Sequence, residues 1–213
     1  MIIAALTVAV SVIAIAGGVN YWAVLAGFVP ARLSGQVDVS GALPAWITLF
    51  SSALIHGGWL HLIINMLMLV FAGSQVERII GASALAFAYV AGALVAALAQ
   101  FLFDPSSPVP MIGASGAISA LFGLYALFFG QPKQVSRNRR LNRGIHVLWL
   151  LATWVVLQWM AGYLAGGQGV MLATPAHIGG FIAGLMLFSL FDPVPRATPH
   201  AADISSPDEP GRV

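Results

Sequence analysis

Residues 111–123 read MIGASGAISALFG and place a single hydroxyl, that of Ser115, among small side chains. From Gly113 to Ala117 no other side chain is larger than a methyl group. Small residues of this kind let helix backbones approach closely, which is typical of helices packed inside a membrane. The stretch therefore predicts a tightly packed helix that carries one polar group in an apolar environment.

The composition of the whole chain indicates the same environment. Of its 213 residues, 59% are hydrophobic and 8% are charged, whereas soluble domains carry about 25% charged residues. Because so few charges cannot cover a water-facing surface, we expect an all-α integral membrane protein in a lipid bilayer. The net charge of +2 is too small to indicate a nucleic-acid partner. The sequence contains no Cys, which excludes disulfides, thiolate nucleophiles and Cys-based metal sites.

Six apolar segments follow one another along the chain. They cover residues 2–24, 58–75, 82–103, 113–130, 145–165 and 175–191, and a bilayer-spanning helix needs about 20 residues. The first segment lacks the basic region of a secretory signal, so we expect it to be retained as a span. We therefore expect one six-span domain over residues 1–191, with a membrane-embedded first loop, and a disordered cytoplasmic tail over residues 192–213.

Basic residues predict the orientation of this bundle. Five of the nine Lys and Arg residues lie in QPKQVSRNRRLNRG, after the fourth segment, so that loop is expected in the cytoplasm. With six spans both termini are then cytoplasmic, and among the basic residues Arg32 alone falls outside. We expect a bacterial inner membrane. A topology signal suffices to explain the basic loop, and lipid or nucleic-acid binding there is the minor alternative.

This topology brings polar groups from three spans to one depth, near the outer face of the membrane. Ser115 begins the fourth span, His177 begins the sixth, and His56, His61 and Asn65 lie at the outer end of the second. Polar side chains inside a membrane are costly, and they are commonly functional. A serine hydroxyl becomes a nucleophile when a neighbouring base takes its proton, and histidine suits that role. Ser115 and His177 are therefore the candidate nucleophile and base, in a site that opens to the outside.

The neighbouring residues fit the same chemistry. His61 and Asn65 are four residues apart, so they share one helix face, and together with the backbone N–H of Ser115 they can stabilise an oxyanion. Gly180 and Gly184 are also four residues apart and predict a close-packing face that brings the sixth helix against the fourth. Each residue alone has a plainer explanation as a packing or interfacial residue, but their joint arrangement favours catalysis.

Three motifs, in this order, resemble those of the rhomboid intramembrane serine proteases. They are HGGWLHLIINML at residues 56–67, GASGAISALFG at 113–123 and AHIGGFIAG at 176–184. The resemblance implies a six-span bundle that cleaves peptide bonds in or near the transmembrane segments of single-span or other membrane-protein substrates, without metal or other cofactor. It implies a dyad of Ser115 and His177, with oxyanion donors from His61 and Asn65. The supporting positions it implies are His56, Gly113 and Gly116, and the packing glycines Gly180 and Gly184 are further supporting positions.

The sequence departs from the usual rhomboid pattern at two places. Ser119 stands where many members have an aromatic residue that stacks on the catalytic histidine. The orientation of His177 must then be held by something else, or held less firmly. Trp46-Ile47 stands where a Trp-Arg pair is common in the first loop, so the usual arginine contacts there are in question.

Two other functions are compatible with parts of this pattern. One is a proteolytically inactive rhomboid-like chaperone or adaptor, which the presence of both Ser115 and His177 disfavours. The other is a small transporter with buried His and Asn along its path, which the lack of an intramembrane carboxylate and of an internal repeat disfavours. For a protease we expect lateral substrate entry near the second and fifth spans, beside a loop made mobile by Gly166, Gly167 and Gly169.

Overall fold

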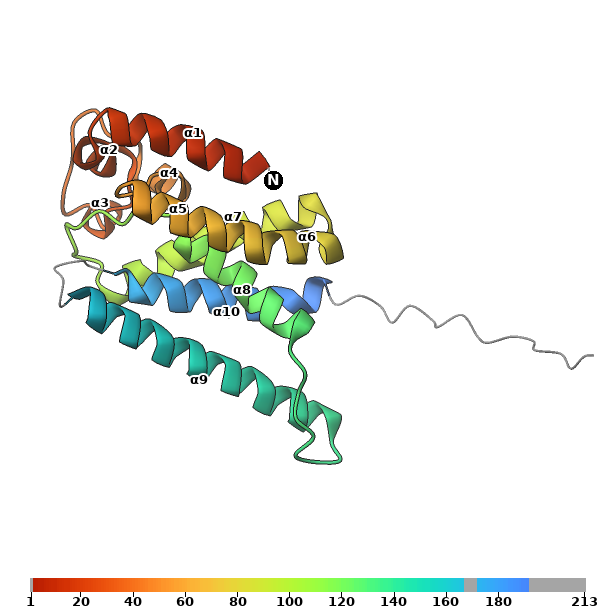
Figure 1. The fold of residues 1–213 in the computed structure, drawn as a ribbon. Helices are drawn as coiled ribbons and strands as arrows, with labels where there is room; N and C mark the ends of the chain where they lie inside the picture. The colour runs from red at the N-terminus through yellow and green to blue at the C-terminus, as the bar shows by residue number, and fades with distance from the viewer. Residues whose placement is uncertain (1, 167–171, 192–213) are drawn as a thin grey trace, which may run out of the picture.

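The computed structural model describes residues 2–166 and 172–191, and its regular elements there are helices. Figure 1 shows α8 and α10 together in the middle of the molecule, with α1 on one side and α9 on the other. The predicted all-helical, membrane-type architecture is confirmed. The tail over 192–213, together with Gly167 and Gly169, lies outside the described residues, so the predictions for them remain predictions.

Within the described part of the chain, four helical runs are long and apolar enough to cross a membrane. They are Trp59–Ile80, Ala82–Phe103, Arg139–Tyr163 and Thr174–Phe191, and the shorter apolar helices are Ile2–Ala16, Ala45–Leu54 and Ser115–Phe129. The first long run consists of α5 (Trp59–Met68), a π-helical segment η2 (Leu69–Gly73) and α6 (Ser74–Ile80). The others are α7 (Ala82–Phe103), α8 (Ser115–Phe129), α9 (Arg139–Gly166) and α10 (Thr174–Phe191).

The expected first segment over residues 2–24 is not one helix. Helix α1 (Ile2–Ala16) ends before Gly17, and α2 (Val19–Ala26) begins after Gly18. Gly18 has a φ of 97°, a left-handed conformation that favours glycine and interrupts a right-handed helix. The prediction of one continuous helix over residues 2–24 was wrong. The sequence stays apolar across Gly17 and Gly18, so hydropathy does not reveal that the backbone changes direction there.

Much of the expected first loop is helical as well. It contains α3 (Pro30–Leu33), α4 (Ala45–Ser51) and the 3-10 turn η1 (Ser52–Leu54). Backbone hydrogen bonds tie this region to the segment before α8: Phe28 and Met111 exchange bonds of 3.0 and 2.7 Å, and the Gly113 N–H donates to the Ser52 carbonyl at 2.9 Å. These bonds determine where α8 can begin, and therefore where Ser115 lies.

The closest helix packing is between α8 and α10, and it depends on glycine. A Cβ atom at Gly180 would collide with the carbonyl oxygen of Gly116, and one at Gly184 would collide with that of Ala120. On another face of α8, a Cβ atom at Gly116 would lie 2.6 Å from the Cβ of Ala96 in α7. The backbones of α8 and α10 therefore touch, which is what the spacing of Gly180 and Gly184 predicts.

Helix α9 packs much less closely than its neighbours. It contacts α10, but none of its apolar stretch is buried inside the molecule. Figure 1 shows it as the outermost helix on its side of the bundle. Membrane lipid or another apolar segment must therefore cover most of its surface.

Candidate active site

Ser115 and His177 form a hydrogen bond across the contact between α8 and α10. The Ser115 Oγ atom lies 2.7 Å from His177 Nε2. Ser115 is the first residue of α8 and His177 the fourth of α10, so both lie at the N-terminal ends of their helices. Both side chains are half-buried. The tight packing of α8 on α10 thus brings a hydroxyl and an imidazole into direct contact.

The other nitrogen of His177 is bonded to a residue that the sequence motifs do not identify. Gln158 of α9 places its Oε1 atom 2.7 Å from His177 Nδ1. An amide oxygen only accepts hydrogen bonds, so Nδ1 carries the hydrogen and Nε2 offers its lone pair to the Ser115 hydroxyl. This is the tautomer that a general base needs. The signal in the sequence is a single amide within an otherwise apolar stretch of α9.

Trp154, one turn before Gln158 on α9, also supports His177. Its indole N–H donates to the carbonyl of His177 at 3.2 Å. The indole ring stacks on Phe181 of α10, with 4.6 Å between centroids and 10° between the ring planes. Ser119, in the place of the usual aromatic, instead donates to the Ser115 carbonyl at 2.8 Å. The histidine is therefore held from α9 rather than from α8.

His61 lies beside this pair, against Gly113. A Cβ atom built on Gly113 would be 2.9 Å from His61 Nε2 and 3.8 Å from Ser115 Oγ, so the imidazole occupies space that only glycine leaves free. Gly113 also has a φ of 122°, which favours glycine. The Gly57 N–H donates to His61 Nδ1 at 3.2 Å, so the neutral ring carries its hydrogen on Nε2. His61 thus presents its Nε2–H beside Gly113, two residues before Ser115.

Asn65 lies one turn after His61 on α5 and is buried. Its side-chain amide donates to the carbonyl of His61 at 2.9 Å. The amide nitrogen has two hydrogens, so it can serve a second acceptor at the same time. The structure therefore places both predicted oxyanion donors on one helix face, with Asn65 partly engaged within its own helix.

His56 is fully buried and links the first helix to the segment before α8. The Ala114 N–H donates to His56 Nε2 at 3.2 Å, so Nδ1 carries the hydrogen and donates to Ser11 Oγ at 2.8 Å. The Ser11 hydroxyl in turn donates to the Leu54 carbonyl at 2.8 Å. Burial, with a smaller contribution from the nearby His61, lowers the pKa of His56 to about 3. His56 is therefore a neutral, structural histidine.

The electrostatics of the site favour negative charge beside Ser115. Helix α8 begins at this residue, and α5 and α10 begin within three residues of His61 and His177. A helix N-terminus carries a partial positive charge and free N–H groups. Among residues 2–166 and 172–191, no group of three or more His, Cys, Asp or Glu is arranged to hold a metal ion. The arrangement suits acyl transfer, in which a hydroxyl attacks and an oxyanion forms next to it.

Comparisons with known proteins agree with these motifs. A family model described as a rhomboid domain matches residues 44–192. The rhomboid protease GlpG of Yersinia enterocolitica is 31% identical over 185 residues, which cover 85% of this chain and 61% of that protein. Rhomboid-related protein 2 of Mus musculus is 29% identical over 153 residues, covering 70% and 50%. RHOMBOID-like protein 5 of Arabidopsis thaliana is 30% identical over 139 residues, covering 65% and 42%.

The chain thus spans between 42% and 61% of the length of these relatives. The family match covers most of the chain and includes the segments that carry both Ser115 and His177. Its motifs, its apolar helices and its sequence relatives agree. The chain is an integral membrane protein that belongs to the rhomboid family.

Proposed function

We propose that this protein is an intramembrane serine endopeptidase that cleaves peptide bonds in or near the transmembrane segments of membrane proteins. The observation that carries the proposal is the 2.7 Å contact between Ser115 Oγ and His177 Nε2. A serine that only packs helices together needs no base. The amide of Gln158 on Nδ1 supports the same role, because it selects the tautomer that can accept the serine proton.

The proposed reaction has two acyl-transfer steps. Ser115 Oγ attacks the substrate carbonyl carbon while His177 Nε2 takes the hydroxyl proton. The resulting oxyanion accepts hydrogen bonds from His61 Nε2–H, the Ser115 backbone N–H and the Asn65 amide. When the C–N bond breaks, His177 returns the proton to the leaving amine. It then takes a proton from the water that attacks the acyl carbon, and it gives that proton to Ser115 Oγ as the bond between Oγ and the acyl carbon breaks.

The proposed substrate is a transmembrane segment that unwinds locally. The peptide carbonyls of a helix are engaged in its own hydrogen bonds, so the scissile bond must leave the helix before Ser115 can reach it. Segments with Gly or Pro near the cleaved bond unwind at lower cost. We propose that such segments enter past α9, since α9 packs least closely on the bundle.

We also propose a six-span topology with the site open to the outside of the cell. Helices α1 and α8 have 15 residues each, which rise about 22 Å against a hydrocarbon core of about 30 Å. A short α8 starts below the membrane surface, which puts Ser115 in a recess that water can enter. The basic loop at the opposite end of α8 favours a cytoplasmic position for that end.

The test is labelling with a fluorophosphonate probe in detergent, together with cleavage of a panel of single-span substrates. Ser83 is a matched control, because it also follows a Gly-Ala pair and is exposed at the start of α7. We expect the wild type and Ser83→Ala to label and cleave, and Ser115→Ala to do neither. Equal labelling or cleavage by Ser115→Ala would contradict the proposal. A wild type that does neither would favour the inactive chaperone or the transporter, and solute flux in liposomes would separate those two.

A further inference from the structure

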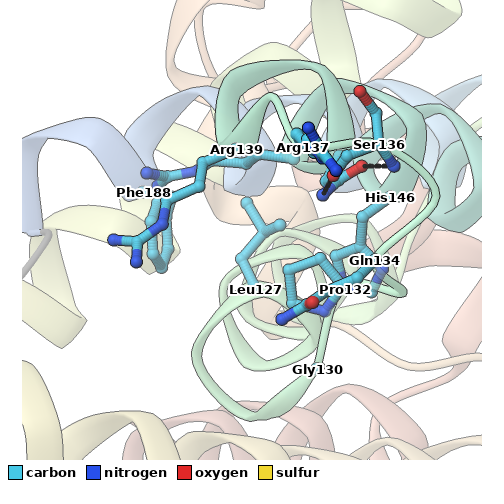
Figure 2. Close-up of a pocket in the computed structure, with 11 residues that line it drawn as sticks. Leu127, Gly130, Pro132, Gln134, Ser136, Arg137, Arg139, His146 and Phe188 are labelled. Carbon is cyan, nitrogen blue, oxygen red and sulfur yellow. Dashed lines mark hydrogen bonds between the residues drawn. The ribbon is translucent and has the colours of Figure 1, made fainter.

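We propose that an anionic glycerophospholipid binds between α8 and α9, with its headgroup in a basic cavity at the end of the bundle opposite Ser115. The cavity has a volume of about 640 Å³. It lies between the end of α8, the loop that follows, the first turns of α9 and Phe188 of α10. Figure 2 shows Leu127 in the middle of this lining, with Phe188 on one side and His146 on the other.

The charge of the cavity predicts an anionic ligand. Its lining includes Arg137, Arg139 and Arg143, and the described lining residues include no Asp or Glu. The Arg143 guanidinium lies over the ring of Phe188, 4.9 Å from its centroid, and so forms part of the wall. Arg137 and Arg139 are exposed. Guanidinium groups match phosphate oxygens well, because they donate pairs of parallel hydrogen bonds.

A buried polar atom in the same lining also points to a ligand. The Nε2 atom of His146 is buried and has no hydrogen-bond partner among the described residues. It lies against Gly130, where a Cβ atom would be 2.7 Å away, so the end of α8 leaves room for the ring. Buried polar atoms are nearly always paired, and a phosphate oxygen in the cavity would provide the partner.

The loop around the cavity is held in place by its own hydrogen bonds. The buried side chain of Asn142 accepts from the N–H groups of Val135 and Ser136, at 3.2 and 2.9 Å, and donates to the Ser136 carbonyl at 2.7 Å. The Asn138 side chain accepts from the N–H groups of Arg140 and Leu141 and so caps α9. The arginines are therefore presented by an ordered turn.

A second, apolar cavity identifies the ligand as a lipid. It has a volume of about 340 Å³, lies between α8 and α9 beside Phe181 of α10, and shares Gly130 with the basic cavity. Its lining includes Phe122, Tyr125, Leu150 and Leu157. A molecule that fills both spaces has an anionic end and a hydrocarbon tail. An acyl chain there would also cover part of α9, whose apolar stretch is not buried by protein.

The test is native mass spectrometry of the delipidated full-length protein in a neutral detergent. It is titrated with dioleoyl phosphatidylglycerol, with dioleoyl phosphatidylcholine of the same chains, and with glycerol 3-phosphate. We expect retention of phosphatidylglycerol, at least tenfold weaker retention of phosphatidylcholine, and no retention of glycerol 3-phosphate. This readout does not depend on proteolysis, so its outcome is separate from that of the proposed function.

Variants assign the binding to these two cavities. Arg137→Gln combined with Arg139→Gln is expected to weaken phosphatidylglycerol binding about 25-fold, which is about fivefold for each charge. Arg140→Gln is the matched control: it removes the same charge from the adjacent residue, which does not line the cavity, and is expected to bind as the wild type. Ala126→Phe fills the apolar cavity without altering charge, and we expect weaker binding there too.

Three results would overturn the inference. Equal retention of the two phospholipids would show that charge is not recognised. Glycerol 3-phosphate binding as tightly as the lipid would assign the site to a free phosphate ester. Undiminished lipid binding by the double arginine variant, with thermal unfolding like that of Arg140→Gln, would place the lipid elsewhere.

Discussion

Replacing Gln158 by Leu tests whether the dyad depends on the loosely packed helix α9. Leu has a similar size but no polar atom, so the change removes the 2.7 Å contact with His177 Nδ1 and little else. During the attack His177 becomes positively charged, and the hydrogen bond from Nδ1 then involves an ion. Such bonds contribute about 1.5–3 kcal/mol. Since about 1.4 kcal/mol is a factor of ten in rate, we expect kcat to fall about 10- to 150-fold.

The assay is cleavage of a single-span substrate in proteoliposomes, with kcat and KM measured separately. We expect KM to change little, because Gln158 contacts the proposed base, His177. Gln158→Glu restores an acceptor for Nδ1 and should recover most of kcat. Its carboxylate favours the protonated imidazole, so the acid limb of the pH–rate profile should move to higher pH. Trp159→Leu, a neighbouring change at a side chain that is 71% exposed, is the matched control.

A Gln158→Leu variant that folds normally and keeps kcat within twofold of wild type would show that Gln158 does not support His177. So would a Gln158→Glu variant that is as inactive as Gln158→Leu and has an unshifted pH–rate profile. If Gln158 has a merely structural role, Gln158→Leu should lower the melting temperature and kcat together. The acid limb of the pH–rate profile of Gln158→Glu should then not shift.

Three further outcomes follow from the structure. Proteolysis should fall at acid pH, because a protonated His177 cannot accept the serine proton. A rate that stays level down to the pH at which the protein unfolds would contradict that role. Gly180→Ala places a Cβ atom on the Gly116 carbonyl. It should lower the free energy of unfolding by about 1–3 kcal/mol and slow the labelling of Ser115 by the probe. Gly144→Ala is the control and should do neither, because a Cβ atom there meets nothing within 4 Å. Folding lowers the pKa of His56 to about 3, so its contribution to stability is full above about pH 6.5 and is lost as pH falls toward 3. His56→Gln should therefore have a lower melting temperature than wild type at pH 7.5. Its melting temperature should fall less than that of wild type between pH 7.5 and pH 5.

The sequence by itself determined the class of the protein and the residues of its candidate site. Too few charges for a water-facing surface indicate a membrane protein whatever the packing. The order of the motifs around His61, Ser115 and His177 indicates the family. Each motif is a short run of consecutive residues, so it can be identified without knowing which residues it contacts in the fold. The glycine spacing in the last helix likewise predicts the contact with α8, since a four-residue repeat defines a helix face.

Tertiary structure alone decided what holds the His177 imidazole. Gln158 is 19 residues from His177 and on another helix, so no spacing rule connects them. The break between α1 and α2 was also hidden, because hydropathy is continuous across Gly17 and Gly18 while the backbone turns. The basic and apolar cavities arise because α9 stands away from α8. The distance between two helices depends on all the side chains between them. The residue pattern of one helix does not contain that information.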